Sequence, residues 1–186
     1  MRLFLTRRVT VLAENGAPQY LIKTNEDVTT RRETESRMAH MAYHDTLTDL
    51  PNRAAFLQAL SQMIEACKGT TEEFAVLSID LDRFKEVNDV FGHEIGDKLL
   101  IEIAHRLETA VQGGVVARLS GDEFGLIIDG PQPQAGLDLA RRLIETMHDE
   151  IMIDGRALRI GLTTGISIFP QNGSTPAELL ANADAA

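Results

Sequence analysis

Hydrophobic positions follow a strand pattern at several places after residue 70, with helical stretches between them. The segment from Phe74 to Leu81 is an almost continuous apolar run that ends in acids, which is typical of a strand buried on both faces. The neighbouring patterns predict a helix at 52–67 opened by Pro51, a helix at 94–111, strands at 115–119 and 124–128, a helix at 134–149, a hairpin turning at Asp154-Gly155, a strand at 160–169 and a helix from Pro176. This order predicts an α+β fold with a ferredoxin-like βαββαβ core, in which helices flank a central antiparallel sheet and the first strand lies beside the hairpin.

The first 44 residues carry weaker patterns. Residues 2–13 and 19–24 alternate well enough for two strands, and Glu14 to Pro18 has the chemistry of a hairpin turn. A helix with a narrow apolar stripe follows, and this stripe could either pack on the next domain or pair with a partner helix. We therefore expect three segments, namely an incomplete hairpin at 1–26, a connector helix at 27–44 and a main domain at 45–186.

Composition narrows the class of protein. The chain has 186 residues, of which 44% are hydrophobic and 25% are charged, as in soluble globular domains. Its net charge of -10 repels polyanions, so we expect no nucleic-acid partner, whereas a phosphate substrate screened by divalent cations is compatible with it. The single Cys67 has no partner thiol and suits a reducing compartment. Since no apolar run approaches the ~20 residues that span a bilayer, we expect a cytoplasmic protein with no membrane segment.

Two acidic clusters carry the candidate chemistry. Asp80 and Asp82 stand at the carboxyl end of the buried strand, and Asp122 and Glu123 lie at the tip of the predicted hairpin beside Gly121. Pairing the two elements would bring the carboxylates to one edge of the sheet, where such a cluster is costly unless a hard cation such as Mg²⁺ occupies it. Taken alone, the hairpin tip is more typical of an ordinary solvated Gly-Asp turn, because such turns are common.

Three motifs in order resemble one known family. They are residues 45–53 (DTLTDLPNR), residues 80–100 (DLDRFKEVND followed by VFGHEIGDKLL) and residues 118–124 (RLSGDEF). Together they make the region from about residue 43 to 186 similar to a GGDEF domain. The resemblance implies an adenylyl-cyclase-like palm that acts as a diguanylate cyclase, with GTP as substrate, two Mg²⁺ or Mn²⁺ ions, and cyclic di-GMP and pyrophosphate as products.

The resemblance also implies the metal ligands and the catalytic acids. Asp80 would bind metal, with the carbonyl of Leu81 assisting it. Asp122 would be a second metal ligand, and Glu123 would help to hold metal or take the proton from the 3′-hydroxyl. Asp80, Asp122 and Glu123 are thus the expected catalytic residues.

A second group of residues is expected to bind GTP. Asn88 and Asp97 would read the guanine edge, because an amide and a carboxylate together satisfy donors and acceptors that adenine would leave unpaired. Phe84 and Lys85 would line the phosphate pocket, and Gly121 would sit against the phosphates.

The chain departs from the family pattern at three places. Ser120 stands where the family usually has glycine, which would cost on the order of 1 kcal/mol if that position needs a positive φ. Val111 and Gly114 occupy the positions of the family's Arg-x-x-Asp product-inhibition site, so feedback through that site should be missing. The final helix stops near Ala186, before the lysine and arginine that contact the triphosphate in the family, so we expect a truncated helix.

Upstream, the hairpin and the residues after it resemble the end of a PAS sensor and its signalling helix. The expected full protein joins PAS to GGDEF, with an EAL phosphodiesterase domain as a further expectation, and works as a homodimer whose connector helices bring two GTP sites face to face. Three functions stay open at this stage, namely a cyclase, a catalytically weak GTP-binding module that regulates a fused cyclic di-GMP phosphodiesterase, and a dimerisation scaffold. The intact acids favour the cyclase.

Overall fold

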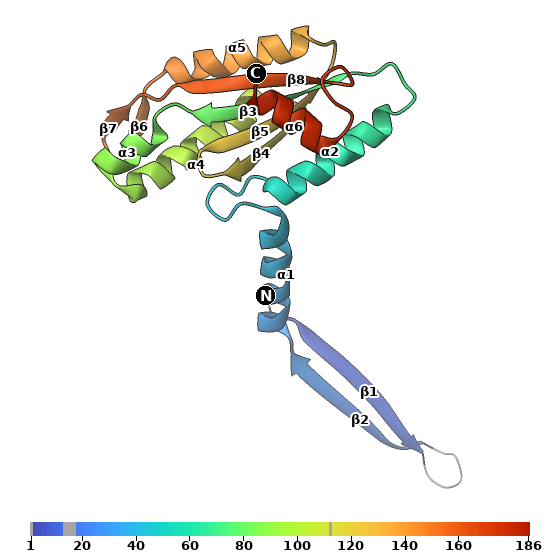
Figure 1. The fold of residues 1–186 in the computed structure, drawn as a ribbon. Helices are drawn as coiled ribbons and strands as arrows, with labels where there is room; N and C mark the ends of the chain where they lie inside the picture. Colours follow the sequence, from blue (N-terminus) through green and yellow to red (C-terminus); the bar gives the residue numbers. More distant parts are fainter. Residues whose placement is uncertain (1, 13–17, 112) are drawn as a thin grey trace. The chain divides into compact units, whose positions relative to one another are not determined.

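The computed structural model describes residues 2–12, 18–111 and 113–186, and the chain divides into a unit at 1–42 and a unit at 43–186 (Figure 1). The turn expected between Glu14 and Pro18 lies outside the described residues except for Pro18. Among the helices of the described ranges, none is long and apolar enough to cross a membrane.

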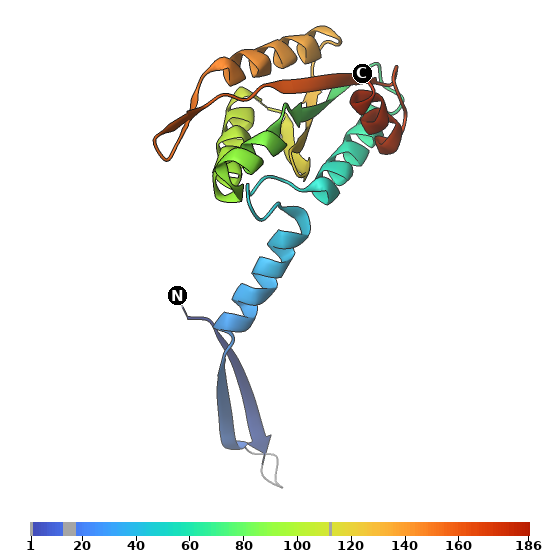
Figure 2. The same cartoon turned by 60° about the vertical axis from the view of Figure 1, so that its left-hand side comes forward.

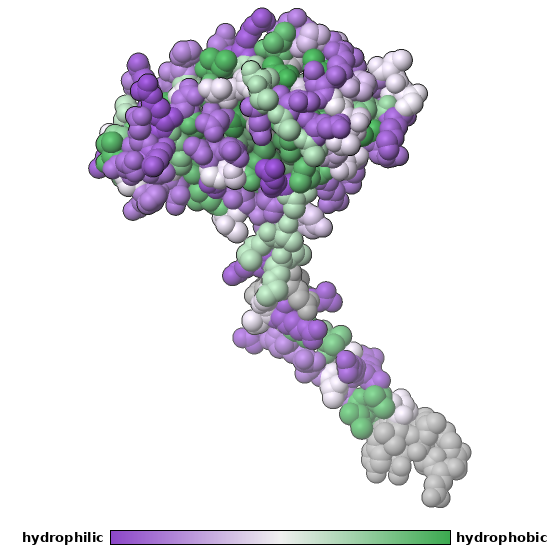
Figure 3. Space-filling view, in the orientation of Figure 1, coloured by the Kyte–Doolittle hydropathy of each residue, from purple (hydrophilic) through white to green (hydrophobic). Residues whose placement is uncertain are grey.

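The first unit contains a hairpin and most of one helix. Strand β1 (Phe4–Leu12) pairs antiparallel with β2 (Pro18–Asp27), and helix α1 (Thr29–Tyr43) follows. The carboxylate of Asp27 accepts a hydrogen bond from the backbone N–H of Thr29 at 3.0 Å, which satisfies one of the free donors at the helix start. Apolar side chains of the hairpin are exposed, and Figure 3 shows hydrophobic residues among hydrophilic ones along it.

The second unit has the predicted α+β architecture. Its elements in chain order are α2 (Arg53–Cys67), β3 (Phe74–Leu81), α3 (Phe84–Phe91), α4 (His93–Ala110), β4 (Val115–Ser120), β5 (Glu123–Asp129), α5 (Gln134–His148), β6 (Ile151–Ile153), β7 (Arg156–Leu158), β8 (Leu162–Phe169) and α6 (Pro176–Asp184). Four of these strands form one antiparallel sheet in the order β4-β5-β3-β8, so β3 lies in the middle beside the hairpin, as predicted.

Helix α3 is the element that the hydrophobic pattern did not predict. A single helix was expected from residue 94, but the structure has two helices separated at Gly92. Gly92 has φ +85°, a left-handed conformation that glycine adopts without the steric cost of a side chain. The break turns the chain and places α3 directly after the acidic end of β3.

The sheet separates two hydrophobic cores. Alternate residues of a strand point to opposite faces, and β3 contributes to both cores. Leu77 and Ile79 lie in the core with α4 and α5, while Phe74 and Val76 lie in the core with α2 and α6. Figure 2 shows α3, α4 and α5 on one side of the sheet and α2 and α6 on the other. Both faces of β3 are therefore covered, which explains its continuous apolar run.

Helix α6 packs unusually close to the sheet. A Cβ atom at Gly165 in β8 would overlap the carbonyl oxygen of Ala183, so the helix can approach only because this position is glycine. The buried hydroxyl of Ser167 donates to the carbonyl of Leu179 at 2.7 Å and links the same two elements. These contacts bring the end of α6 over the middle of the sheet.

A single arginine ties the loop before α2 to the β4–β5 turn. The guanidinium of Arg118 donates to Asp45 Oδ1 at 2.9 Å and, through Nε and Nη2, to the carbonyl of Gly121 at 3.0 and 2.7 Å. The backbone N–H of Arg118 donates to the carbonyl of Pro51 at 2.9 Å. Burial raises the pKa of Asp45, but hydrogen bonds from Arg118 and Thr48 outweigh it, so the pKa is below its ordinary value.

We expect this ion pair to make stability depend on pH. Because folding lowers the pKa of Asp45, its contribution is complete above the ordinary carboxyl pKa of about 3.9 and is lost as the pH falls through the lower folded value. Asp45→Asn should therefore cost about 1 to 2 kcal/mol near neutral pH and progressively less in acid, as measured by thermal unfolding across that pH range. Asp149→Asn, at an exposed carboxylate, is the control. An equal loss for Asp45→Asn at neutral and acid pH would show that the charge is not the cause.

Candidate active site

The sheet register places two carboxylates opposite one another. In the β3–β5 pair Asp80 lies directly across from Glu123, and in the β3–β8 pair Asp80 lies across from Thr163. Directly opposed residues share a face and have Cβ atoms about 5 Å apart. On this face of β3 the residues change from apolar Phe74 and Val76 to polar Ser78 and Asp80, so the α2–α6 core gives way to a polar site at the end of the strand.

Asp122 completes the acidic group from the turn between β4 and β5. It is half-buried, next to Glu123. Loss of water around Asp80, together with the negative charges of Asp122, Glu123 and Asp82, raises the pKa of the Asp80 carboxyl. Such mutual repulsion is relieved by a bound hard cation, which prefers carboxylate oxygens as ligands. The structure therefore brings together the three acids that the sequence singled out.

Asp82 has a different environment from Asp80. Strand β3 ends at Leu81, so Asp82 lies just beyond it. Its carboxylate accepts a hydrogen bond from the hydroxyl of Thr163 at 2.8 Å, and its backbone N–H donates to the carbonyl of Gly161 at 3.0 Å. These bonds hold Asp82 against the start of β8. The buried side chain of Leu81 faces the core, which leaves its main-chain carbonyl as the group that a metal could use.

The β4–β5 turn shows why serine is accepted in the signature. Gly121 has φ +34°, whereas Ser120 is absent from the residues with positive φ, so the strain considered for Ser120 does not arise. The hydroxyl of Ser120 instead donates to Glu123 Oε2 at 2.5 Å. A Cβ atom at Gly121 would meet nothing within 4 Å, so the turn there is open to a ligand. The hydrogen bond from Ser120 to Glu123 is a feature that sequence reasoning missed.

A cavity of about 460 Å³ lies beside the acids. Asp80, Glu123 and Thr163 line one part of it, and the end of α6 lines another. The hydroxyl of Ser78 donates to the carboxylate of Asp184 and joins β3 to α6 within this cavity. No sequence motif had drawn attention to Ser78, because a serine inside an apolar strand carries no signal until its neighbours are known. The volume and the polar lining suit a phosphate chain with its cations.

The corner between α3 and α4 holds the residues expected to read a base. Asn88 is half-buried and Asp97 is exposed, and neither side chain has a hydrogen-bond or ion-pair partner within the described part of the chain. Phe84 is only 8% exposed and belongs to the core, so only its backbone at the start of α3 is available to a phosphate. Lys85 is exposed, and its ammonium can reach a ligand from the same turn.

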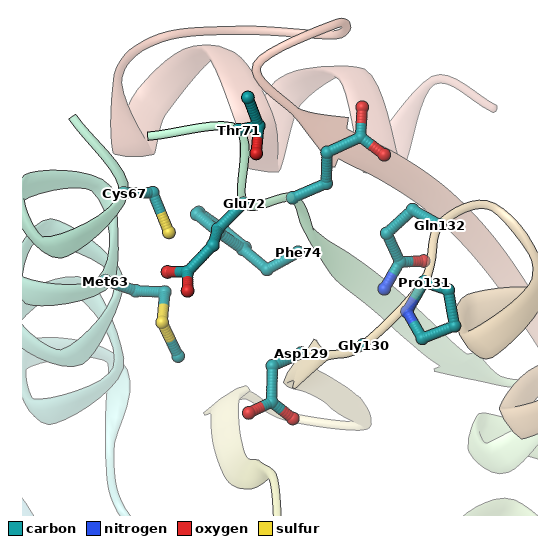
Figure 4. A pocket seen from close by; sticks show the side chains of 10 residues that line it. Met63, Cys67, Thr71, Glu72, Phe74, Asp129, Gly130, Pro131 and Gln132 are labelled. Atoms are coloured by element: carbon teal, nitrogen blue, oxygen red, sulfur yellow. The ribbon is translucent and has the colours of Figure 1, made fainter. Parts of the chain in front are cut away.

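Another cavity lies at the opposite end of β3 and does not belong to this site. Its volume is about 440 Å³, and Met63, Cys67 and Phe74 form an apolar part of its lining (Figure 4). Figure 4 also shows the carboxylates of Glu72 and Asp129 at this cavity. Phe74 is six residues before Asp80, which corresponds to about 20 Å along a strand. The cavity that adjoins the acids around Asp80 is therefore the one of about 460 Å³.

Comparison with known proteins agrees with this geometry. The family model described as "Diguanylate cyclase, GGDEF domain" matches residues 42–186. Diguanylate cyclase TpbB of Pseudomonas aeruginosa is 41% identical over 158 residues, which cover 83% of this chain and 36% of that protein. The bifunctional diguanylate cyclase/cyclic di-GMP phosphodiesterase MucR of the same species is 39% identical over 165 residues, 88% of this chain and 24% of that protein. The chain thus spans about a third or less of these curated relatives.

A solved structure gives the same result in three dimensions. The crystal structure of a sensory box/GGDEF family protein from Caulobacter crescentus matches with a TM-score of 0.74 and 44% sequence identity. The match covers 77% of this chain and 94% of that one. With the family model spanning the whole second unit and the three acids gathered at the end of β3, the chain belongs to the diguanylate cyclase GGDEF domain family.

Proposed function

We propose that this chain is the catalytic palm of a diguanylate cyclase that joins two GTP molecules into cyclic di-GMP. The observation that carries the proposal is the sheet register, which sets Glu123 opposite Asp80 with Asp122 in the adjoining turn. A domain that only bound nucleotide would not need three carboxylates converging on one point. The net charge of -10 supports a substrate that arrives with divalent cations over a bare polyanion such as nucleic acid.

The donor set suits two Mg²⁺ or Mn²⁺ ions. Asp80, the Leu81 carbonyl, Asp122 and Glu123 offer only hard oxygen ligands, which these ions prefer. When bound, such ions neutralise charge that develops on the phosphates and the leaving group. The hydrogen bond from Ser120 orients the Glu123 carboxylate through its Oε2 atom, and Arg118 holds the turn through the Gly121 carbonyl.

The remaining residues bind and orient GTP. Asn88 and Asp97 face the guanine edge. The phosphate oxygens are contacted by the side chain of Lys85 and by the backbone around Phe84 and Gly121. The 3′-oxygen of each GTP attacks the α-phosphorus of the other GTP. The bond between this phosphorus and the oxygen that bridges the α- and β-phosphates breaks, and pyrophosphate leaves. Glu123 is placed to accept the 3′-hydroxyl proton.

The reaction needs two palms, because each holds one nucleotide. We propose a homodimer in which two active sites face each other and copies of α1 pair as the connector. Met38 and Met41 of α1 are 63% and 50% exposed, which supports an apolar stripe available to a partner helix.

The exposed apolar side chains of the β1–β2 hairpin support its origin in a longer sensor domain of the PAS type. An EAL domain beyond residue 186 belongs to the same proposal.

The alternative is a GTP-binding module that regulates a fused phosphodiesterase. MucR, a relative with both activities in its name, makes this arrangement relevant. The absence of positive φ at Ser120 favours the cyclase over the module, since the substitution in the signature does not strain the turn.

The decisive experiment is incubation of the protein at high concentration with GTP and Mg²⁺, followed by chromatography for cyclic di-GMP. We expect product from the wild-type chain and at least about a 100-fold lower rate from Asp122→Ala, because even groups that only support metal ligands are worth 10- to 100-fold. Asp149→Ala is the matched control, since that exposed carboxylate follows the end of α5 and is not among the acids around Asp80. Absence of product with GTP still bound would support the regulatory module instead.

Ser120 provides a second test. Removing its hydroxyl frees the Glu123 carboxylate, so Ser120→Ala should lower the Mg²⁺ concentration for half-maximal turnover by up to about fivefold, the value of one modest hydrogen bond. Ser120→Gly should have the same effect. Because glycine also changes the freedom of the backbone, equal results would assign the effect to the missing hydroxyl. A Mg²⁺ titration that both variants leave unchanged would show that Ser120 does not act on Glu123.

Product feedback should be absent at the primary inhibitory position. Val111 is 6% exposed and apolar, and a Cβ atom at Gly114 would lie 2.5 Å from the carbonyl oxygen of Ile127. Added cyclic di-GMP should therefore leave the initial rate unchanged. Gly114→Asp with Val111→Arg should lose about 1 to 3 kcal/mol in urea denaturation without gaining inhibition, because the new side chain has no room. Inhibition of the wild-type chain by product would refute this expectation.

A further inference from the structure

The side chain of Asn88 lies directly over Gly96. A Cβ atom at Gly96 would overlap Asn88 Oδ1, and it would lie 3.0 Å from Asn88 Cγ and 3.3 Å from Phe84 Cζ. Gly96 is buried within α4 and is not among the residues with positive φ, so its backbone does not require glycine. Glycine inside a helix is less favourable than alanine. The reason for glycine at this position is therefore the space that Asn88 occupies.

Helices α3 and α4, which meet at Gly96, are both anchored in the core and cannot move apart to make room for a side chain. Ile95 and Leu99 are 7% and 0% exposed and anchor α4 in the core on either side of Gly96. Phe84 is in the same core and fixes the start of α3. A side chain at position 96 would thus displace the Asn88 amide, the flexible end of the contact, while both helices stay in place.

The Asn88 amide occupies the space left by the missing side chain of Gly96. Within the described ranges its side chain has no hydrogen-bond partner, although it is half-buried. A half-buried amide without a protein partner favours a ligand that supplies one. Asp97, which follows Gly96 in the chain, places a carboxylate without a protein partner at the same corner. The two groups offer donors and an acceptor to one planar ligand edge.

We infer that Gly96 is a positioning residue that sets base specificity: its missing side chain seats the Asn88 amide beside Asp97 for the guanine edge. The inference rests on the proposed function, since it assigns the base to this corner. The N1–H and the exocyclic amine of guanine donate to the Asp97 carboxylate, while its O6 and N7 accept from the Asn88 amide. Adenine has no N1–H or 2-amine to donate to Asp97 and carries an amine in place of O6, so of these contacts it keeps only the one to N7.

The test compares purine binding by wild type and Gly96→Ala. Calorimetric titration with the α,β-methylene analogues of GTP and ATP in Mg²⁺ avoids turnover. We expect Gly96→Ala to weaken binding of the GTP analogue about tenfold or more, to weaken binding of the ATP analogue much less, and to keep the thermal stability of the domain. Gly136→Ala, the same change at a buried glycine of α5, is the matched control and should leave both affinities as they are.

A double variant separates positioning from folding. In an Asn88→Ala background the overlap with Asn88 is gone, so adding Gly96→Ala should neither weaken nucleotide binding further nor lower stability. If Asn88→Ala/Gly96→Ala unfolds, the contact with Phe84 explains Gly96 and the inference is wrong. It is also wrong if Gly96→Ala keeps the wild-type preference for the GTP analogue. A wild-type chain that binds both analogues equally would overturn the proposed guanine site and the inference with it, whereas a preference that survives Gly96→Ala overturns the inference alone.

Discussion

The antiparallel register of β3 with its two neighbours is the constraint on which the site depends. It sets Asp80 in a row between Glu123 and Thr163. Two residues earlier, in the next row on the same face, it sets Ser78 between Gly125 and Gly165. A shift by one residue would move Asp80 to the opposite face and place Leu81 or Ile79 at the site. The register is held by two hydrophobic cores on opposite faces of the sheet, since a shift would also move Phe74 and Val76 out of the core in which they pack.

The two rows have different physical roles. In the row of Asp80, loss of water and the charges of nearby carboxylates raise the pKa of Asp80, so the folded protein holds a charge arrangement that a cation relieves. In the row of Ser78, the flanking glycines remove side chains from the sheet surface. The Phe56 ring lies where a side chain at Gly125 would project, and α6 approaches over Gly165. The helix that closes the cavity can therefore lie one row from the acids.

Support for the acids comes from residues that do not touch a substrate. Arg118 connects the loop before α2 to the carbonyl of Gly121, and Ser120 bonds Glu123 from within the turn. Gly92 separates α3 from α4, so that the Asn88 side chain lies over Gly96, the residue before Asp97. Each of these contacts joins segments whose proximity depends on the sheet.

The sequence by itself determined the α+β order, the central place of β3 and the identity of the acids. An apolar run ending in Asp80 reports burial on both faces, and the motifs around it are specific enough to identify the family. It did not predict helix α3, because this helix has only eight residues, too few for the hydrophobic period to mark it. It also assigned a cost to Ser120 that the backbone at that position does not incur. The roles of Ser78, Arg118 and Gly165 were decided by tertiary structure alone, since each contacts a segment far away in the chain, and local pattern carries no record of which segments will meet. The role of Gly96 likewise depends on how α4 packs against α3.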